Sequence, residues 1–184
     1  MNVRRIADSP DATFALGLAV GALARPGLVI ALVGQLGAGK TLFTRGLHRG
    51  LGLSDEAWSG SPTFVLATRY SGSPPLLHAD LYRLSSAGEV SDLGIEDALA
   101  DGAVVVVEWA DRLPGALPPE RLTATFEVHG EHRREIVLDA AGRAAERLLE
   151  ELSRGDLHAT EPSRGGVESN RGPGFVTSEG GRWP

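Results

Sequence analysis

Residues 28–41 have the sequence LVIALVGQLGAGKT, and this stretch decides the fold. Its first part, Leu28 to Val33, is a continuous apolar run, as expected of a strand that is covered on both faces. Its second part, Gly34 to Thr41, fits the phosphate-binding pattern G-x-x-x-x-G-K-[ST]. A predicted helix, Leu42 to Leu51, follows. A strand leading into the loop and a helix leading out of it are the context in which this motif binds a triphosphate.

The chemistry of the loop explains its residue types. Glycines let main-chain N–H groups converge on phosphate oxygens, and the following helix points its positive end at the anion. Lys40, the single lysine of the chain, would reach the β- and γ-phosphates, and Thr41 would offer its hydroxyl to Mg²⁺. We therefore expect the nucleotide to be bound by Gly34, Gly37, Ala38, Gly39, Lys40, Thr41 and Leu42.

Two acidic residues are candidates for hydrolysis. Asp80 ends the predicted strand Leu76 to Asp80, and Glu108 follows the apolar run Val104 to Val107. In open α/β sheets, ligands bind at the carboxyl ends of strands. One carboxylate would hold Mg²⁺ or its water shell, and the other would orient or deprotonate the attacking water.

Two further elements carry polar groups. The segment Ser61-Pro62-Thr63-Phe64 is a candidate switch loop, because the Thr63 hydroxyl could touch the metal or the γ-phosphate. His78 precedes Asp80 by two residues, which places both side chains on one face of a strand. With no further ligand near in the sequence, a hydrogen-bonded histidine is favoured over a transition-metal ligand.

Strands alternate with helices along the chain, which predicts an α/β fold, and the phosphate loop indicates the P-loop NTPase type. We expect a mostly parallel central sheet with helices on both faces. Leu122 to Val128 and Arg133 to Ala140 would form an antiparallel hairpin added at one edge. This domain is expected to span residues 1–153. Residues 154–184 are rich in Gly, Ser, Glu, Arg and Pro, which predicts a disordered tail.

Composition excludes several classes of function. The chain has 184 residues and no cysteine, which excludes disulfides, cysteine zinc sites and thiol nucleophiles. A net charge of −6 argues against a broad basic face for nucleic acid. No apolar run approaches membrane-spanning length and no signal-peptide pattern follows Met1, so a cytoplasmic location is expected.

Four elements together resemble the bacterial TsaE (YjeE) family. They are the phosphate loop, then Ser61 to Phe64, then His78-Ala79-Asp80-Leu81-Tyr82-Arg83, then Glu108-Trp109 with Arg112, in the order and approximate spacing of that family. The resemblance extends from about Val3 to Leu152. It implies a P-loop ATPase of the tRNA N6-threonylcarbamoyladenosine modification system that does not act on tRNA directly but resets the TsaD–TsaB complex.

The resemblance also implies roles for individual residues. Lys40 and Thr41 would bind triphosphate and Mg²⁺, Glu108 would lie at the metal, and Asp80 would be the other acid needed for hydrolysis. Thr63 would belong to the switch-like loop, and Trp109 would shape the site or a partner surface. The candidates for the adenine pocket are Asp11, at the start of the first helix, and Arg133, in the hairpin.

Three alternatives share parts of this pattern. A small-molecule kinase with a P-loop fold would need an arginine-rich lid, and no such cluster occurs between Ser85 and Leu113. A GTPase would carry Asn-Lys-x-Asp, which is impossible because Lys40 is the only lysine. A scaffold that only binds nucleotide would not need the pair of acids.

Overall fold

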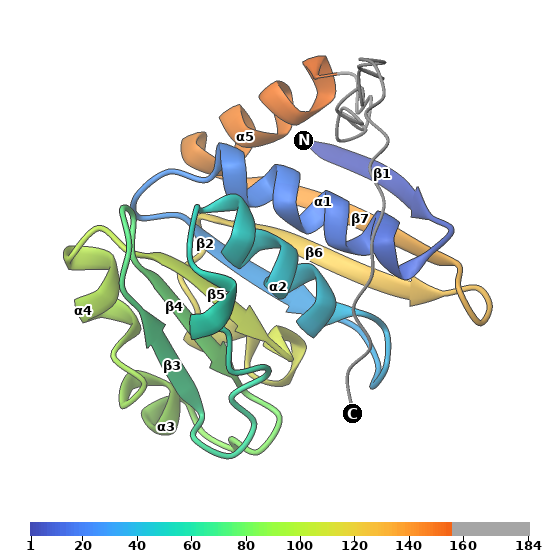
Figure 1. Cartoon of the computed structure of the whole chain (residues 1–184). Coiled ribbons are helices and arrows are strands. Elements are labelled where there is room, and N and C mark those ends of the chain that lie inside the picture. The colour runs from blue at the N-terminus through green and yellow to red at the C-terminus, as the bar shows by residue number, and fades with distance from the viewer. Residues whose placement is uncertain (156–184) are drawn as a thin grey trace, which may run out of the picture.

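The computed structural model describes residues 1–155 and contains one seven-stranded sheet with the strand order β1-β7-β6-β2-β5-β4-β3 (Figure 1). The strands are β1 Asn2–Ala7, β2 Val29–Val33, β3 Ala67–Tyr70, β4 Leu76–Asp80, β5 Val104–Glu108, β6 Arg121–Val128 and β7 Arg134–Ala141. The helices are α1 Pro10–Leu23, α2 Lys40–Gly50, α3 Ala87–Ser91, α4 Ile95–Ala100 and α5 Arg143–Arg154. The chain also forms short 3-10 turns at Asp55–Ala57, Ala110–Arg112 and Pro114–Ala116.

The centre of the sheet is parallel, as predicted. Strand β2 pairs in parallel with β5 and β6, and β5 pairs in parallel with β4. The predicted hairpin is confirmed, because β6 and β7 pair antiparallel and β1 adds to β7. Antiparallel pairing occurs at the other edge too, where β3 joins β4 across a short turn. Two strands joined by so short a connection pair antiparallel, since a parallel pair needs a long crossover.

Helices cover both faces of the sheet. On one face α1, α2 and α5 pack against alternate strand residues such as Ile30, Val106 and Leu122. On the other face α3 and α4 pack against the residues between them, such as Ala31 and Val105. Because β2 and β5 are covered on both sides, their apolar runs have no wet face. This explains why both strands are continuous in Val, Ile, Ala and Leu.

The helices α1 and α2 touch backbone to backbone. A Cβ atom added at Gly17 of α1 would lie 2.1 Å from the carbonyl oxygen of Phe43, and one added at Gly46 of α2 would lie 2.1 Å from that of Phe14. Glycine is therefore required at this crossing. The close packing fixes α2, whose N-terminus carries the phosphate loop.

Three local patterns of the sequence can be compared with the structure. Ser9-Pro10-Asp11 predicts a helix start with Ser9 as N-cap, and the Ser9 hydroxyl accepts a hydrogen bond from the N–H of Ala12 where Pro10 begins α1. The stretch from Ser85 to Ala100 is predicted to be helical in pieces and interrupted near Gly94, and Gly94 lies between α3 and α4. A strand is predicted from Phe64 to Tyr70, which is too long, because β3 begins only at Ala67.

The shortening of β3 has a local cause. Leu66 has a φ of 67°, and its N–H donates to the carbonyl of Pro62, which closes a turn before the strand. Phe64 and Val65 are consequently exposed, at 86% and 69%. Phe64 and Val65 are bulky and apolar, which predicts a strand from the sequence, but the turn keeps them out of the sheet.

No helix within residues 1–155 is long and apolar enough to cross a membrane. The helical spacing of Ala145, Leu148, Leu149 and Leu152 predicts the inner face of a last helix. These four are the buried residues of α5, which ends at Arg154. Residues 156–184, which make up nearly all of the predicted tail, lie outside the described residues.

Candidate active site

The phosphate loop connects β2 to α2 at the carboxyl end of β2. Gly39 precedes α2 with a φ of 108°, and Gly34 follows β2 with a φ of 150°, both unfavourable for other residues. A Cβ atom at Gly34 would also lie 2.9 Å from the carbonyl oxygen of Phe126. The loop borders a cavity of about 270 Å³, lined by Leu36, Gly37, Ala38, Gly39, Lys40, Thr41, Leu42, Ser61, Thr63, Asp80, Glu108 and Trp109.

Lys40 is buried at the base of this cavity. Its ammonium group donates hydrogen bonds to the carbonyl oxygens of Gly34 and Gln35, the latter at 3.0 Å, and lies 3.7 Å from the ring centroid of Trp109. Burial lowers the pKa of Lys40 from its ordinary value, and the charges of Glu108, Asp111 and Asp80 oppose this shift. The loop thus holds a buried cation against its own main-chain carbonyl oxygens.

Thr41 and Glu108 meet in the cavity. The Thr41 hydroxyl donates to Oε2 of Glu108 at 2.9 Å, and Glu108 is 2% exposed. Glu108 ends β5, which pairs with β2, so the register of the parallel strands brings this acid to the loop. A hydroxyl and a carboxylate are hard oxygen donors of the type that Mg²⁺ takes from proteins. The pair therefore fits a magnesium ion.

Asp80 is the hub of a second hydrogen-bond network. Its Oδ2 accepts hydrogen bonds from the hydroxyls of Ser61 at 2.8 Å and Thr63 at 2.7 Å. Its Oδ1 accepts from the N–H of Tyr82 at 2.8 Å. The candidate switch loop is thus tied to the acid at the end of β4, and Thr63 and Asp80 line the cavity together.

Trp109 follows Glu108 with a left-handed φ of 58°. Because of this backbone conformation the chain turns sharply after β5. The indole ring lies over Lys40 and packs against the ring of Tyr82, with 4.9 Å between centroids. Trp109 therefore forms a wall of the cavity.

The two adenine candidates lie outside the cavity wall. Asp11 and Arg133 are exposed, and Arg133 forms an ion pair with Asp8 at 3.4 Å. A smaller cavity of about 110 Å³ adjoins the loop between their neighbours, lined by Pro10, Thr13, Gly37, Gly39, Leu42, Glu131, His132 and Arg134. The next arginine, Arg134, is the one that reaches the loop, with Nη2 3.4 Å from the carbonyl oxygen of Gly37.

Comparison with known proteins adds to this geometry. A sequence model of the family described as "Threonylcarbamoyl adenosine biosynthesis protein TsaE" matches residues 7–136. The chain belongs to the TsaE family. The match includes the phosphate loop, both acids and the candidate switch loop.

Individual TsaE proteins are similar over most of the chain. The protein of Bacillus subtilis (strain 168), named "tRNA threonylcarbamoyladenosine biosynthesis protein TsaE", is 42% identical over 149 residues, which are 80% of this chain and 92% of that protein. The Treponema pallidum (strain Nichols) protein of the same name is 38% identical over 136 residues, 74% of this chain and 99% of that protein.

A solved structure shares the fold. The crystal structure of Bacillus subtilis YdiB superposes with a TM-score of 0.72 at 36% sequence identity, covering 85% of this chain and 97% of that chain. The expected P-loop NTPase-like architecture is therefore confirmed.

The sequence predicts that His78 is hydrogen-bonded but does not identify its partner. Its Nε2 atom lies 2.9 Å from Oε1 of Glu108, so the favoured hydrogen-bonded histidine is confirmed. The sequence could not name the partner, because the pair depends on the register of β4 against β5. The ring also stacks on Trp58, which carried no recognisable signal.

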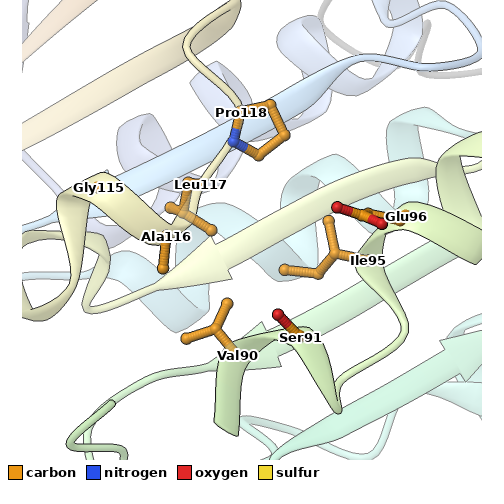
Figure 2. A pocket seen from close by; sticks show the side chains of 8 residues that line it. All are labelled: Val90, Ser91, Ile95, Glu96, Gly115, Ala116, Leu117 and Pro118. Atoms are coloured by element: carbon orange, nitrogen blue, oxygen red, sulfur yellow. The ribbon is translucent and has the colours of Figure 1, made fainter. Parts of the chain in front are cut away.

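A larger cavity of about 380 Å³ shares no residue with this site (Figure 2). It lies between α3, α4 and the turn at Pro114–Ala116, and Figure 2 shows mostly apolar side chains, with the hydroxyl of Ser91 and the carboxylate of Glu96 as polar groups. Its lining residues are Val90, Ser91, Ile95, Glu96, Gly115, Ala116, Leu117 and Pro118. No motif of the sequence lies there.

Proposed function

We propose that this TsaE-family chain binds and hydrolyses ATP with Mg²⁺ in the biosynthesis of tRNA N6-threonylcarbamoyladenosine, acting in the cytoplasm on the TsaD–TsaB complex and not on tRNA itself. The names of its relatives support the pathway. The observation that carries the ATPase proposal is the meeting of Lys40, Thr41, Glu108 and Asp80 around one cavity at the phosphate loop.

Each residue has a separate task in this proposal. Lys40 exchanges its carbonyl contacts for β- and γ-phosphate oxygens, and the main-chain amides of Gly37 to Leu42 surround the phosphates. Thr41 and Glu108 would hold Mg²⁺, whose positive charge would offset the negative charge of the triphosphate. Asp80 orients the attacking water, and Thr63 fixes the Asp80 carboxylate. Trp109 shields the phosphates from bulk water.

The base would extend from the loop toward the smaller cavity. That cavity touches Gly37, Gly39 and Leu42 on one side and the hairpin residues His132 and Arg134 on the other. Asp11 and Arg133 are the chain neighbours of its lining residues Pro10 and Arg134, and they remain our candidates for its rim. Pro10 and Thr13 at the start of α1 offer the apolar contact that an adenine ring needs.

Hydrolysis by the isolated chain should be slow. None of the described residues that line the phosphate cavity is an arginine, and Lys40 is the single cationic residue among them. P-loop enzymes that receive such a charge from a partner gain about 10³–10⁵-fold in turnover. We therefore propose that the TsaD–TsaB complex raises the rate.

The test measures phosphate release from MgATP by the purified chain, alone and with added TsaD–TsaB complex. Weak turnover alone, a higher rate with the complex and loss of turnover in Glu108→Ala and Asp80→Ala support the proposal. Phosphate release that is unchanged in both variants would show that the two acids have no part in hydrolysis, which would favour a scaffold that only binds nucleotide. Phosphorylation of a small acceptor in place of phosphate release would instead identify a small-molecule kinase.

A further inference from the structure

An aromatic cluster lies behind Glu108. The ring of His78 stacks on Trp58, with 5.6 Å between centroids and an interplanar angle of 11°. Trp58 also stacks on Tyr70, and His48 of α2 packs edge-on against Trp58 and Tyr70. His48 and His78 are fully buried. The cluster therefore holds the His78 ring in one plane.

The two histidines of the cluster differ in their hydrogen bonds. Neither ring nitrogen of His48 has a partner within residues 1–155, and burial lowers its pKa. In His78 only Nδ1 lacks a partner there, because Nε2 bonds to Oε1 of Glu108. A carboxylate can only accept, so Nε2 is the donor. His78 thus acts on Glu108, whereas His48 only fills space.

Glu108 is held from two sides. Oε1 accepts from His78 at 2.9 Å, and Oε2 accepts from Thr41 at 2.9 Å. With Oε1 fixed, the rotation of the carboxylate is fixed too, and Oε2 is left facing the cavity. A buried carboxylate without that partner would lose a charge-assisted hydrogen bond and could rotate.

We propose that His78, clamped by Trp58, is a positioning residue that orients the Glu108 carboxylate for Mg²⁺. The proposal rests on the proposed function, because it assigns the metal to the Thr41–Glu108 pair. His78 touches neither nucleotide nor metal in this account. Its effect passes through one hydrogen bond to the carboxylate.

Trp58 gives this clamp a second connection. The same segment of chain carries Ser61 and Thr63, whose hydroxyls bond to Asp80. Within residues 58–63, Trp58 therefore packs on His78, the hydrogen-bond partner of Glu108. Ser61 and Thr63 of the same segment bond directly to Asp80. The segment fixes both carboxylates of the site from one loop.

The test measures ADP binding by calorimetry, once with Mg²⁺ and once with EDTA, in the full-length chain. The ratio of the two affinities is the magnesium gain. Loss of a group that orients a metal ligand costs about 10–100-fold in metal affinity. We expect His78→Leu to lower the magnesium gain about tenfold while the affinity in EDTA stays unchanged. His78→Gln keeps an N–H donor and should retain most of the gain.

His48→Leu is the matched control. It removes an equally buried histidine from the same cluster without touching Glu108, so its magnesium gain should equal that of the wild type. Equal losses in His48→Leu and His78→Leu would reduce the role of His78 to packing and overturn the proposal. An unchanged gain in His78→Leu would overturn it as well.

Trp58→Leu covers the case in which His78→Leu does not fold. It leaves the hydrogen bond in place and removes the stacking, so a reduced magnesium gain is expected, and an unchanged gain counts against the clamp. Failure of the proposed function has a different signature. If the wild type shows no magnesium gain at all, the metal assignment itself is wrong, whatever the His78 variants do.

Discussion

The hydroxyl of Thr41 lies 2.9 Å from Oε2 of Glu108, although the two residues are 67 positions apart in the chain. The contact joins the first turn of α2 to the end of β5. It exists because β2 and β5 are neighbouring parallel strands, with Leu32 opposite Glu108. The pairing turns two sequence motifs into one site.

Glu108→Gln tests the metal assignment. Glutamine keeps the shape of the side chain but removes the negative charge that Mg²⁺ requires. We expect phosphate release to fall about 100-fold or more, because loss of a group that merely orients a metal ligand already costs about 10–100-fold. Steady-state phosphate assays at several magnesium concentrations measure the effect. Glu96→Gln, in the separate cavity, is the control, and an equal loss there would contradict the assignment.

Thr63→Val tests the link between the switch loop and Asp80. The change keeps the volume and removes the hydroxyl that donates to Oδ2 at 2.7 Å. A hydrogen bond to a charged group contributes about 1.5–3 kcal/mol, so turnover should drop about tenfold or more. ADP affinity should stay within twofold, because the phosphate loop is unaltered.

Thr63→Ser is the rescue variant for this link. It restores the hydroxyl on a smaller side chain and should recover most of the turnover in the same assay. If Thr63→Val hydrolyses ATP at the wild-type rate, the hydrogen bond to Asp80 has no part in the reaction.

The burial of Lys40 predicts a pH dependence of stability. Its pKa is lowered in the folded chain from an ordinary value of 10.5, so between the two pKa values the unfolded chain binds more protons at this group. The free energy of unfolding contributed by Lys40 therefore rises with pH. Lys40→Met lacks this contribution.

Urea unfolding of the wild type and Lys40→Met without nucleotide measures that contribution. The stability of the wild type relative to the variant should increase as the pH is raised from neutral toward 10.5. A difference that stays level or shrinks would show that the Lys40 pKa is not lowered by folding.

Gly46→Ala tests the close crossing of α1 and α2. The added methyl group would meet the Phe14 carbonyl oxygen at 2.1 Å, so the helices must separate. Overpacking of this kind costs about 1–3 kcal/mol, and thermal or urea unfolding measures it. Gly88→Ala in α3 is the control, because its nearest neighbour, the Ser86 hydroxyl oxygen, is 3.9 Å away. If both variants have the same stability, the helices are not in backbone contact.

The elements that could be predicted from the sequence depend on local patterns. The phosphate loop is a contiguous motif, the cap at Ser9 is set by its immediate neighbours, and the runs before Asp80 and Glu108 are apolar because both faces are covered. The carboxyl ends of parallel strands meet at one edge of the sheet. The gathering of both acids at the loop therefore followed from their positions alone.

What the sequence did not predict depends on register and on contacts between distant segments. Arg133 is the adenine candidate, whereas Arg134, one residue later, is the arginine that reaches the Gly37 carbonyl oxygen; the sequence alone does not distinguish which of two neighbouring arginines points toward the loop. The start of β3 depends on a turn at Leu66 that its apolar neighbours conceal. The clamp of Trp58 on His78 joins a loop to a buried strand, and no local pattern signals such a contact.

The most direct test of the account is calorimetric titration of MgATP into the wild type and into Lys40→Ala. We expect one tight site per wild-type chain and loss of tight binding in the variant. Both proteins should unfold at similar temperatures, because Lys40 contacts the loop and Trp109 more than the core. Equal affinities in the two proteins would contradict the assignment of the phosphate loop as the nucleotide site.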